Sequence, residues 1–235
     1  MRFRDRREAG RRLADRLAPL RSDRPVVVAL PRGGVAVAAE VASALQAPLD
    51  VLVVRKLGHP GEPELGVGAI AEGGVSVVNR ELMAHLGISA VALEQVAEVE
   101  RTELERRVDR YRGGHPRVPV AGRTVVLVDD GLATGFTARA AIDGLRRAGA
   151  GTVWLAVPVA PADTLAELRS IADAVVCLQT PDRFRAIGEW YDDFSQVSDA
   201  EVTGLLATAC GAVTDRSPQS GCGTFGPPEN QGPAG

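Results

Sequence analysis

Lysine and cysteine are scarce in this chain of 235 residues. Lys56 is the single lysine among 27 basic residues, and it lies in Val-Val-Arg-Lys-Leu rather than in a Gly-x-x-x-x-Gly-Lys-Ser/Thr motif. Nucleoside triphosphate hydrolases that need this motif are therefore excluded. The three cysteines, Cys177, Cys210 and Cys222, have no Cys-x-x-Cys spacing. A disulfide framework or a structural zinc site is therefore not expected.

The chain also lacks an apolar run of bilayer length, and its first residues lack the apolar segment of a secretory signal. We therefore expect a cytoplasmic protein with no membrane partner. No charge sign dominates, because 27 Lys and Arg stand against 30 Asp and Glu and the net charge is −3. This balance provides no general attraction for nucleic acid, and we expect no nucleic-acid partner.

Short apolar runs alternate with helical patterns along most of the chain, which predicts an α/β fold with a mostly parallel sheet flanked by helices. The predicted strands cover residues 26–30, 49–54, 75–78, 125–128, 152–157 and 174–178. The predicted helices cover residues 4–20, 35–45, 81–112 with a break near 87–89, 138–148, 163–170 and 199–209.

Two segments fall outside this alternation. Residues 57–74 are rich in Gly, Pro and Glu, and predict a long loop with short strands inside it. Residues 211–235 are rich in Gly, Pro and Ser, and predict a disordered tail after a single domain at 1–210.

The most informative pattern is the apolar run 125–128 followed by Asp129, Asp130 and a turn of small residues that opens a helix. The N-terminus of a helix offers free N–H groups and a positive dipole end, which suit a phosphate. Thr134 and Thr137 add hydroxyl donors, and Gly135 allows close approach of the backbone. The acids would repel a phosphate, so they more plausibly accept hydrogen bonds from sugar hydroxyls. The pattern predicts a clamp for ribose 5-phosphate, and a plain helix cap after a strand is the alternative.

The stretch Asp-Asp-Gly-Leu-Ala-Thr-Gly-Phe-Thr at 129–137 resembles the signature of the type I phosphoribosyltransferases, and the adenine version in particular. Phe136 departs from the family, which usually has a small residue there. The resemblance implies a hood over the acceptor and transfer of ribose 5-phosphate from phosphoribosyl pyrophosphate to a nitrogenous base. It also implies Mg²⁺ held mainly through that ligand, with no metal site built from the protein. Asp129 and Asp130 would contact the ribose, and the 5′-phosphate would contact Ala133, Thr134, Gly135, Phe136 and Thr137.

A second loop, Leu-Pro-Arg-Gly-Gly-Val at 30–35, resembles the pyrophosphate loop of the same family. Arg32 would bind pyrophosphate as a fork, with Gly33 and Gly34 beside it. An ordinary strand-to-helix turn is the alternative. The resemblance also places Lys56 on the pyrophosphate, so Lys56, Asp129 and Asp130 are the candidate catalytic residues. The single lysine could equally be a chance survivor in an arginine-rich chain.

Residues 181–209, together with the N-terminal helix, are the predicted hood. The aromatic residues in 184–194 either help to form it or pack a domain edge or a dimer interface. The Phe-Arg-Asp-Arg start and the stretch Asp-Phe-Ser-Gln-Val-Ser-Asp at 193–199 resemble a bacterial group of predicted phosphoribosyltransferases. A homodimer is compatible with that resemblance. The alternative function is a non-catalytic regulator that binds phosphoribosyl pyrophosphate or a nucleotide.

Overall fold

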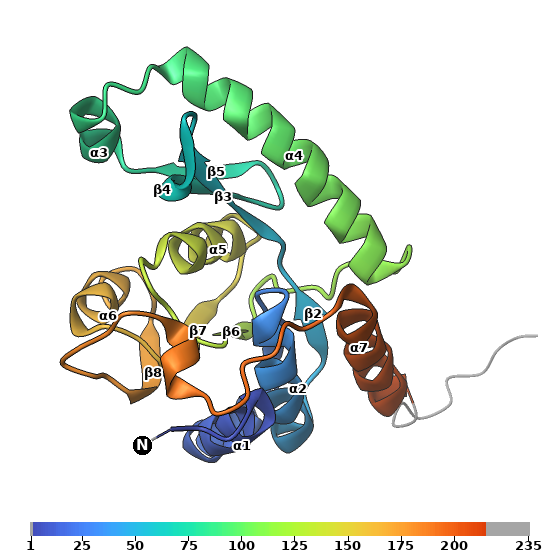
Figure 1. Ribbon diagram of the computed structural model, residues 1–235. Helices are drawn as coiled ribbons and strands as arrows, with labels where there is room; N and C mark the ends of the chain where they lie inside the picture. Colours follow the sequence, from blue (N-terminus) through green and yellow to red (C-terminus); the bar gives the residue numbers. More distant parts are fainter. Residues whose placement is uncertain (1, 215–235) are drawn as a thin grey trace, which may run out of the picture.

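The computed structural model describes residues 2–214, as two sheets with helices around them (Figure 1). The helices are α1 (Arg6–Leu17), α2 (Gly33–Leu45), α3 (Arg80–His85), α4 (Ala90–Arg112), α5 (Phe136–Arg147), α6 (Ala162–Leu168) and α7 (Asp199–Thr214), with 3-10 helices η1 (Ala18–Asp23) and η2 (Ile187–Trp190). The strands are β1 (Val26–Ala29), β2 (Leu49–Val51), β3 (Val54–His59), β4 (Glu62–Ala71), β5 (Val75–Val78), β6 (Thr124–Val128), β7 (Thr152–Val159) and β8 (Ala174–Gln179).

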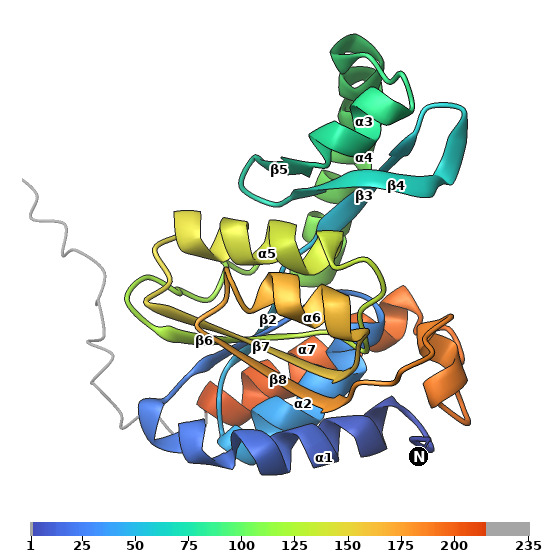
Figure 2. The ribbon, with the colours of Figure 1, turned by 90° about the vertical axis from the view of Figure 1, so that its left-hand side faces the viewer.

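The larger sheet has five strands in the order β2-β1-β6-β7-β8, and every neighbouring pair is parallel. The predicted parallel sheet is therefore confirmed. Figure 2 shows helices on both faces, with α5 and α6 on one and α1, α2 and α7 on the other. The last residues of β1 and β6 lie side by side, because Ala29 pairs with Val128. The segments that follow these two strands therefore start next to each other.

Helices cover both faces of the sheet, and alternate side chains of each strand point to opposite faces. Val27, Val126 and Val128 belong to a core cluster shared with α1, α2 and α7. Val125 and Leu127 belong to a second cluster shared with α5 and α6. This two-sided burial explains why the strands appear in the sequence as unbroken apolar runs.

Strands β3, β4 and β5 form a separate antiparallel sheet, which carries α3 and α4 above the larger sheet in Figure 1. The prediction of a long loop at residues 57–74 is wrong, because most of this segment is strand. Its glycines serve close strand contacts: a Cβ at Gly58 would lie 2.3 Å from the Pro63 carbonyl oxygen, and one at Gly68 would lie 2.4 Å from the Val77 oxygen. Glycine here marks close approach of two backbones rather than a loop.

The predicted break in the charged helical stretch is confirmed, since α3 ends at His85 and α4 begins at Ala90. Each helix has its own N-cap: the Asn79 side chain accepts a hydrogen bond from the Leu82 N–H, and the Ser89 side chain accepts one from the Ala92 N–H.

Two helices differ most from the prediction. The first helix ends at Leu17 and continues as η1, which contains Pro19. Helix α7 extends to Thr214, so residues 211–214 of the predicted disordered tail are helical. The rest of that tail, residues 215–235, lies outside the described residues.

An ion network joins the small sheet to the larger one. The Arg112 guanidinium at the end of α4 pairs with Glu72, donates to the Val51 carbonyl oxygen at 2.9 Å, and lies 3.4 Å from the Asp50 carboxylate. The second Asp50 oxygen accepts a hydrogen bond from the Val118 N–H at 2.8 Å. Within residues 2–214, no helix is both long enough and apolar enough to span a membrane.

Candidate active site

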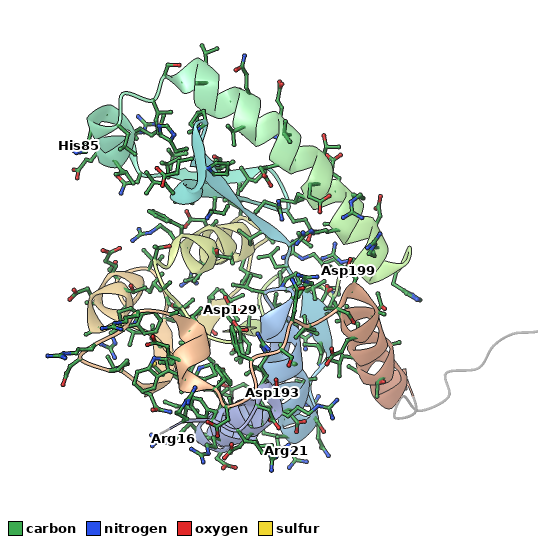
Figure 3. The ribbon with its side chains drawn as sticks, viewed as in Figure 1. Arg16, Arg21, His85, Asp129, Asp193 and Asp199 are labelled. Carbon is green, nitrogen blue, oxygen red and sulfur yellow. The ribbon has the colours of Figure 1, made fainter. Side chains whose placement is uncertain are left out.

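The five parallel strands present a natural ligand site where the chain changes direction across the sheet. From β1 the chain passes through α2 to β2, and from β6 it passes through α5 to β7 on the other side. The switch point therefore lies between β1 and β6, and a crevice outside the carboxyl ends of the strands is the usual ligand site there. Figure 3 shows Asp129 at this position, between α2 and α5.

Asp129 and Asp130 follow β6 directly, and the Asp130 N–H donates to Asp129 Oδ1 at 2.8 Å. Burial raises the pKa of Asp129 well above its ordinary value, and the neighbouring Asp130 carboxylate raises it further. Burial also raises the pKa of Asp130, against the opposing effect of the Arg6 guanidinium. A pair of buried acids with perturbed pKa values in a ligand crevice is typical of a functional site.

The loop after β1 lies against this acid pair. A Cβ at Gly33 would lie 1.9 Å from Asp130 Oδ2, and one at Gly34 would lie 2.9 Å from the Asp129 Cα. The peptide bond between Pro31 and Arg32 is cis. The two glycines are therefore needed for close contact between two loops, and the two sequence motifs form one site.

The turn after the acid pair is held by hydrogen bonds from neighbouring segments. The Leu132 N–H donates to the Val159 carbonyl oxygen at 3.0 Å, and Thr164 Oγ1 donates to the Ala133 oxygen at 2.8 Å. Gly135 adopts a φ of 74° as the N-cap of α5, a conformation that favours glycine. The turn therefore presents the start of α5 in a fixed position.

Thr134, Gly135 and Phe136 line a hollow of about 240 Å³ together with side chains of α6 and Asn79. Phe136 packs against the apolar cluster formed by the small sheet and Ala140. A large residue fits at this position of the turn because the small sheet provides a surface for it. Thr137 is the second residue of α5 and is half-buried.

Arg32 and Lys56, the predicted contacts for pyrophosphate, lie on different elements. Arg32 precedes α2, and its Nη1 lies 4.0 Å from Asp199 Oδ1 at the start of α7. Lys56 lies on β3 and lines a hollow of about 620 Å³ that also borders α4. Contact of either residue with pyrophosphate stays a prediction.

Asp199 connects three segments around Arg32. It accepts a hydrogen bond from the Tyr111 hydroxyl at 2.8 Å and pairs with Arg110. Burial raises the pKa of Tyr111 to about 12, and the Asp199 carboxylate also raises it. The Asp-Phe-Ser-Gln-Val-Ser-Asp stretch ends on this residue, but its sequence alone gives no sign of a contact with the loop after β1.

Arg6 is the residue at the site that the sequence patterns miss. Its Nε donates to Asp130 Oδ2 at 2.7 Å, and both side chains are nearly buried, with 11% and 12% exposed. Arg6 is the last residue of the Phe-Arg-Asp-Arg start at positions 3–6, so this start ends on a direct partner of the acid pair. A general rule also indicates such a partner. Buried carboxylates are almost always paired, and this chain supplies arginine rather than lysine as the cation.

The predicted hood segment packs partly against the body of the domain. Tyr191 is buried with Phe3 and Ala9, while Phe194 remains partly exposed. A Cβ at Gly131 would lie 2.7 Å from the Ile187 side chain, so η2 covers the beginning of the loop after Asp130. The role of residues 181–209 as a hood stays a prediction.

Cys177 packs against the core on the α5 and α6 side, and burial raises the pKa of its thiol. His85 lies on α3, far from Asp129 in Figure 3. Among the described residues, no three His, Cys, Asp or Glu side chains gather as a group that could hold a metal ion.

The sequence of this chain matches a known family. Residues 6–194 match the model of the family described as phosphoribosyl transferase domain. The matched region begins at Arg6 and ends at Phe194, and it contains both loops and the acid pair.

Two proteins of Mycobacterium tuberculosis, from strains CDC 1551 / Oshkosh and ATCC 25618 / H37Rv, are named "Putative phosphoribosyl transferase" and are each 52% identical to this chain over 207 residues. The match covers 88% of this chain and 47% of each relative, so the chain spans about half the length of these curated proteins. An adenine phosphoribosyltransferase of Thermobifida fusca is 33% identical over 120 residues, which cover 49% of this chain and 66% of that protein.

The crystal structure of TT1426 from Thermus thermophilus has the same overall fold. It superposes with a TM-score of 0.76 at 45% sequence identity and covers 88% of this chain and 99% of that one. The family model spans most of the chain and includes every element of the acid-pair site. The chain therefore belongs to the phosphoribosyl transferase domain family.

Proposed function

We propose that this chain binds phosphoribosyl pyrophosphate and transfers its ribose 5-phosphate to a nitrogenous base. The observation that carries the proposal is the position of Asp129 and Asp130. They lie at the switch point of the sheet, directly before the turn that opens α5 and against Gly33. Hydroxyl-binding acids beside a phosphate-binding helix N-terminus suit a phosphorylated pentose.

Each part of the site would take one part of this ligand. Asp129 and Asp130 would accept hydrogen bonds from the ribose hydroxyls. The backbone N–H groups of residues 133–137 would donate to the 5′-phosphate, because they are the free donors at the start of α5. The pyrophosphate would lie between Arg32, the Gly33–Gly34 backbone and Lys56, because the two positive charges oppose its negative charge.

The reaction needs no nucleophile from the protein. The bond between C1 of the ribose and the diphosphate oxygen breaks, a bond from C1 to the acceptor nitrogen forms, and pyrophosphate leaves. The protein would contribute by holding donor and acceptor together and by stabilising the charge on the leaving group.

Mg²⁺ suits this ligand because it prefers oxygen donors and keeps several of its waters. We propose that it would be held mainly by the oxygens of phosphoribosyl pyrophosphate, where it would supply positive charge against the negative charge of the departing pyrophosphate.

The family supports the reaction class, and the partial match to an adenine phosphoribosyltransferase supports a nitrogenous base as the acceptor. The choice among bases depends on the side chains that surround the acceptor. A cytoplasmic location and a homodimer stay predictions.

Calorimetric titration with phosphoribosyl pyrophosphate, with and without Mg²⁺, tests the binding step. We expect Mg²⁺-assisted binding that Asp129→Asn and Asp130→Asn weaken on the order of a hundredfold, because each loses charge-assisted hydrogen bonds. The matched control is Asp15→Asn, an exposed acid on α1 that should bind as the wild type does. Absence of binding by folded wild-type protein would overturn the proposal.

Release of pyrophosphate with a panel of nucleobases tests the transfer step. We expect turnover with at least one base and loss of turnover in the two Asn variants. Tight binding without turnover across the whole panel would instead make the chain a sensor of phosphoribosyl pyrophosphate.

A further inference from the structure

The two ends of the family-matched region meet at the acid pair. The Phe3 N–H donates to the Trp190 carbonyl oxygen at 2.8 Å, and the Asp192 N–H donates to the Phe3 oxygen at 2.8 Å. The rings of Phe3 and Tyr191 lie 5.4 Å apart in the same buried cluster. Two segments from opposite ends of the domain are thus fastened to each other beside the loop after β6.

Arg6 extends from the start of α1 across this junction. Besides its bond to Asp130, its Nη1 donates to the Ser195 carbonyl oxygen at 2.8 Å. Its guanidinium lies 3.9 Å from the centre of the Phe194 ring and 5.9 Å from that of Tyr191. The guanidinium is therefore fixed by an acid, a carbonyl and an aromatic face, which suits its planar shape.

Asp130 is held both at its side chain and at its main chain. Arg6 binds the side-chain carboxylate, and the Tyr191 hydroxyl donates to the main-chain carbonyl oxygen at 2.6 Å. A Cβ on Gly33 would lie 1.9 Å from the carboxylate and 3.0 Å from Arg6 Nε, so the loop after β1 packs directly against both side chains. The Asp130 carboxylate has little freedom to turn.

The charged and titratable groups facing Asp130 are few. Arg6 faces it from α1, Asp129 from its own loop, and the Tyr191 hydroxyl from the segment after β8. Gly33, which faces it from the loop after β1, carries no charge. Arg6 is thus the cation that favours the ionised form of a nearly buried carboxylate next to a second acid.

We infer that Arg6 is a positioning residue of the active site: it holds the Asp130 carboxylate charged and oriented against the pyrophosphate loop, so that the acid pair is ready for the ribose hydroxyls. Arg6 acts through Asp130 and does not touch the ligand. This inference rests on the proposed binding of phosphoribosyl pyrophosphate. It assigns to the N-terminal helix and the segment 191–195 a shared role in preparing the site.

Two variants separate the charge of the Arg6 side chain from the planar shape of its guanidinium. Arg6→Gln keeps a long polar side chain without the charge, while Arg6→Lys keeps the charge without the planar fork. Arg7→Ala, an exposed neighbour on α1, is the control. Each protein is titrated with phosphoribosyl pyrophosphate and Mg²⁺ between about pH 5 and pH 9, a span that brackets neutral pH on both sides.

We expect Arg6→Gln to bind about tenfold more weakly at neutral pH and to lose binding at a pH about one unit higher than the wild type does. The sign follows from the hydrogen bonds: the ribose hydroxyls need ionised acceptors, and removing Arg6 favours the protonated acid. Arg6→Lys should restore most of the pH profile but not the full affinity. A purely structural role would lower the melting temperature without moving the pH profile.

The carboxyl ¹³C signal of Asp130 in ligand-free protein provides an independent readout, and its titration midpoint should rise in Arg6→Gln. If wild-type protein binds and Arg6→Gln has the same affinity, pH profile and carboxyl midpoint, the inference alone is overturned. If folded wild-type protein does not bind the ligand at all, both the inference and the proposed function fall.

Discussion

Residues 2–214 contain two nearly buried clusters in which one arginine meets two acids, and the clusters differ in the hydrogen bonds that their acids accept. Arg112 pairs with Glu72, lies beside Asp50, and donates to a main-chain carbonyl, while the second Asp50 oxygen accepts a main-chain N–H. Arg6 donates to Asp130 at the end of β6, and Asp129 lies next to it. Burial raises the pKa of both acids in this second cluster.

We expect the first cluster to have a structural role and the second a functional one. The Arg112 cluster joins α4 and the small sheet to the edge of the larger sheet, so its bonds are satisfied within the protein. The Arg6 cluster lies at the switch point of the sheet and includes an acid whose ionisation is made costly by burial. Proteins tolerate such costs at sites where a bound ligand completes the hydrogen bonds of the charged groups.

The largest expected effect is on stability at the Arg112 cluster. Arg112→Ala should lower the free energy of unfolding by about 3–5 kcal/mol, because it leaves two nearly buried acids without their cation. Urea denaturation measures this loss. The control is Arg106→Ala on the same helix, an exposed arginine whose pair with Glu103 is screened by solvent and should contribute little to stability.

The comparison predicts a smaller stability loss for Arg6→Gln than for Arg112→Ala, since Asp130 can avoid the cost of a buried charge by taking up a proton. Equal losses in the two variants would contradict the division into a structural and a functional cluster.

The next effect concerns close contact between the two loops. Gly33→Ala should weaken binding of phosphoribosyl pyrophosphate by at least about a hundredfold, because a Cβ would lie 1.9 Å from Asp130 Oδ2 and must displace the carboxylate. Calorimetry measures the affinity. Gly204→Ala on α7, where a Cβ meets nothing within 4 Å, is the matched control and should bind normally.

A stabilising effect is expected at Asp129. Its folded pKa is raised above the ordinary value of 3.8, so the folded protein binds the proton more tightly than the unfolded chain does. Stability is therefore lost as the pH rises from about 4 through the folded pKa. Asp129→Asn should raise the free energy of unfolding at pH 7 by about 1–2 kcal/mol, while it weakens binding of the ligand.

The gain of Asp129→Asn over the wild type should shrink as the pH falls toward about 4, where the aspartate becomes protonated in both the folded and the unfolded state. Thermal melts across this range measure the trend. An equal or lower stability of the variant at pH 7 would show that Asp129 is not strained by its burial.

The smallest effect is expected on the surface of α4. Bonds from Arg106 and Arg107 lower the pKa of Glu103 to about 2. Because this pKa is lowered, the contribution to stability is present above the ordinary value of 4.5 and is lost as the pH falls toward 2. Glu103→Gln should cost no more than about 0.5 kcal/mol near pH 7 after solvent screening, and the difference should disappear near pH 2. A loss as large as that of Arg112→Ala would remove the contrast between surface and buried pairs.

The sequence by itself determined the parallel sheet and the loop after β6. Continuous apolar runs mark strands buried on both faces, and two acids before a small-residue turn mark the carboxyl end of one of them. These are local patterns, so they remain readable without any knowledge of distant contacts. The strand at 75–78 was predicted, but most of β3 and β4 was predicted as a long loop with short strands inside it, because the glycines that permit close strand contact give the same composition as a loop.

Only the tertiary structure decided which cation belongs to which acid. Arg6 and Asp130 are 124 positions apart, and Arg112 and Asp50 are 62 apart. The sequence contains 26 arginines, and nothing in their spacing selects these two. The choice follows from the order of the strands and the packing of α1 and α4, because a buried ion pair forms only where the fold brings both groups together out of water.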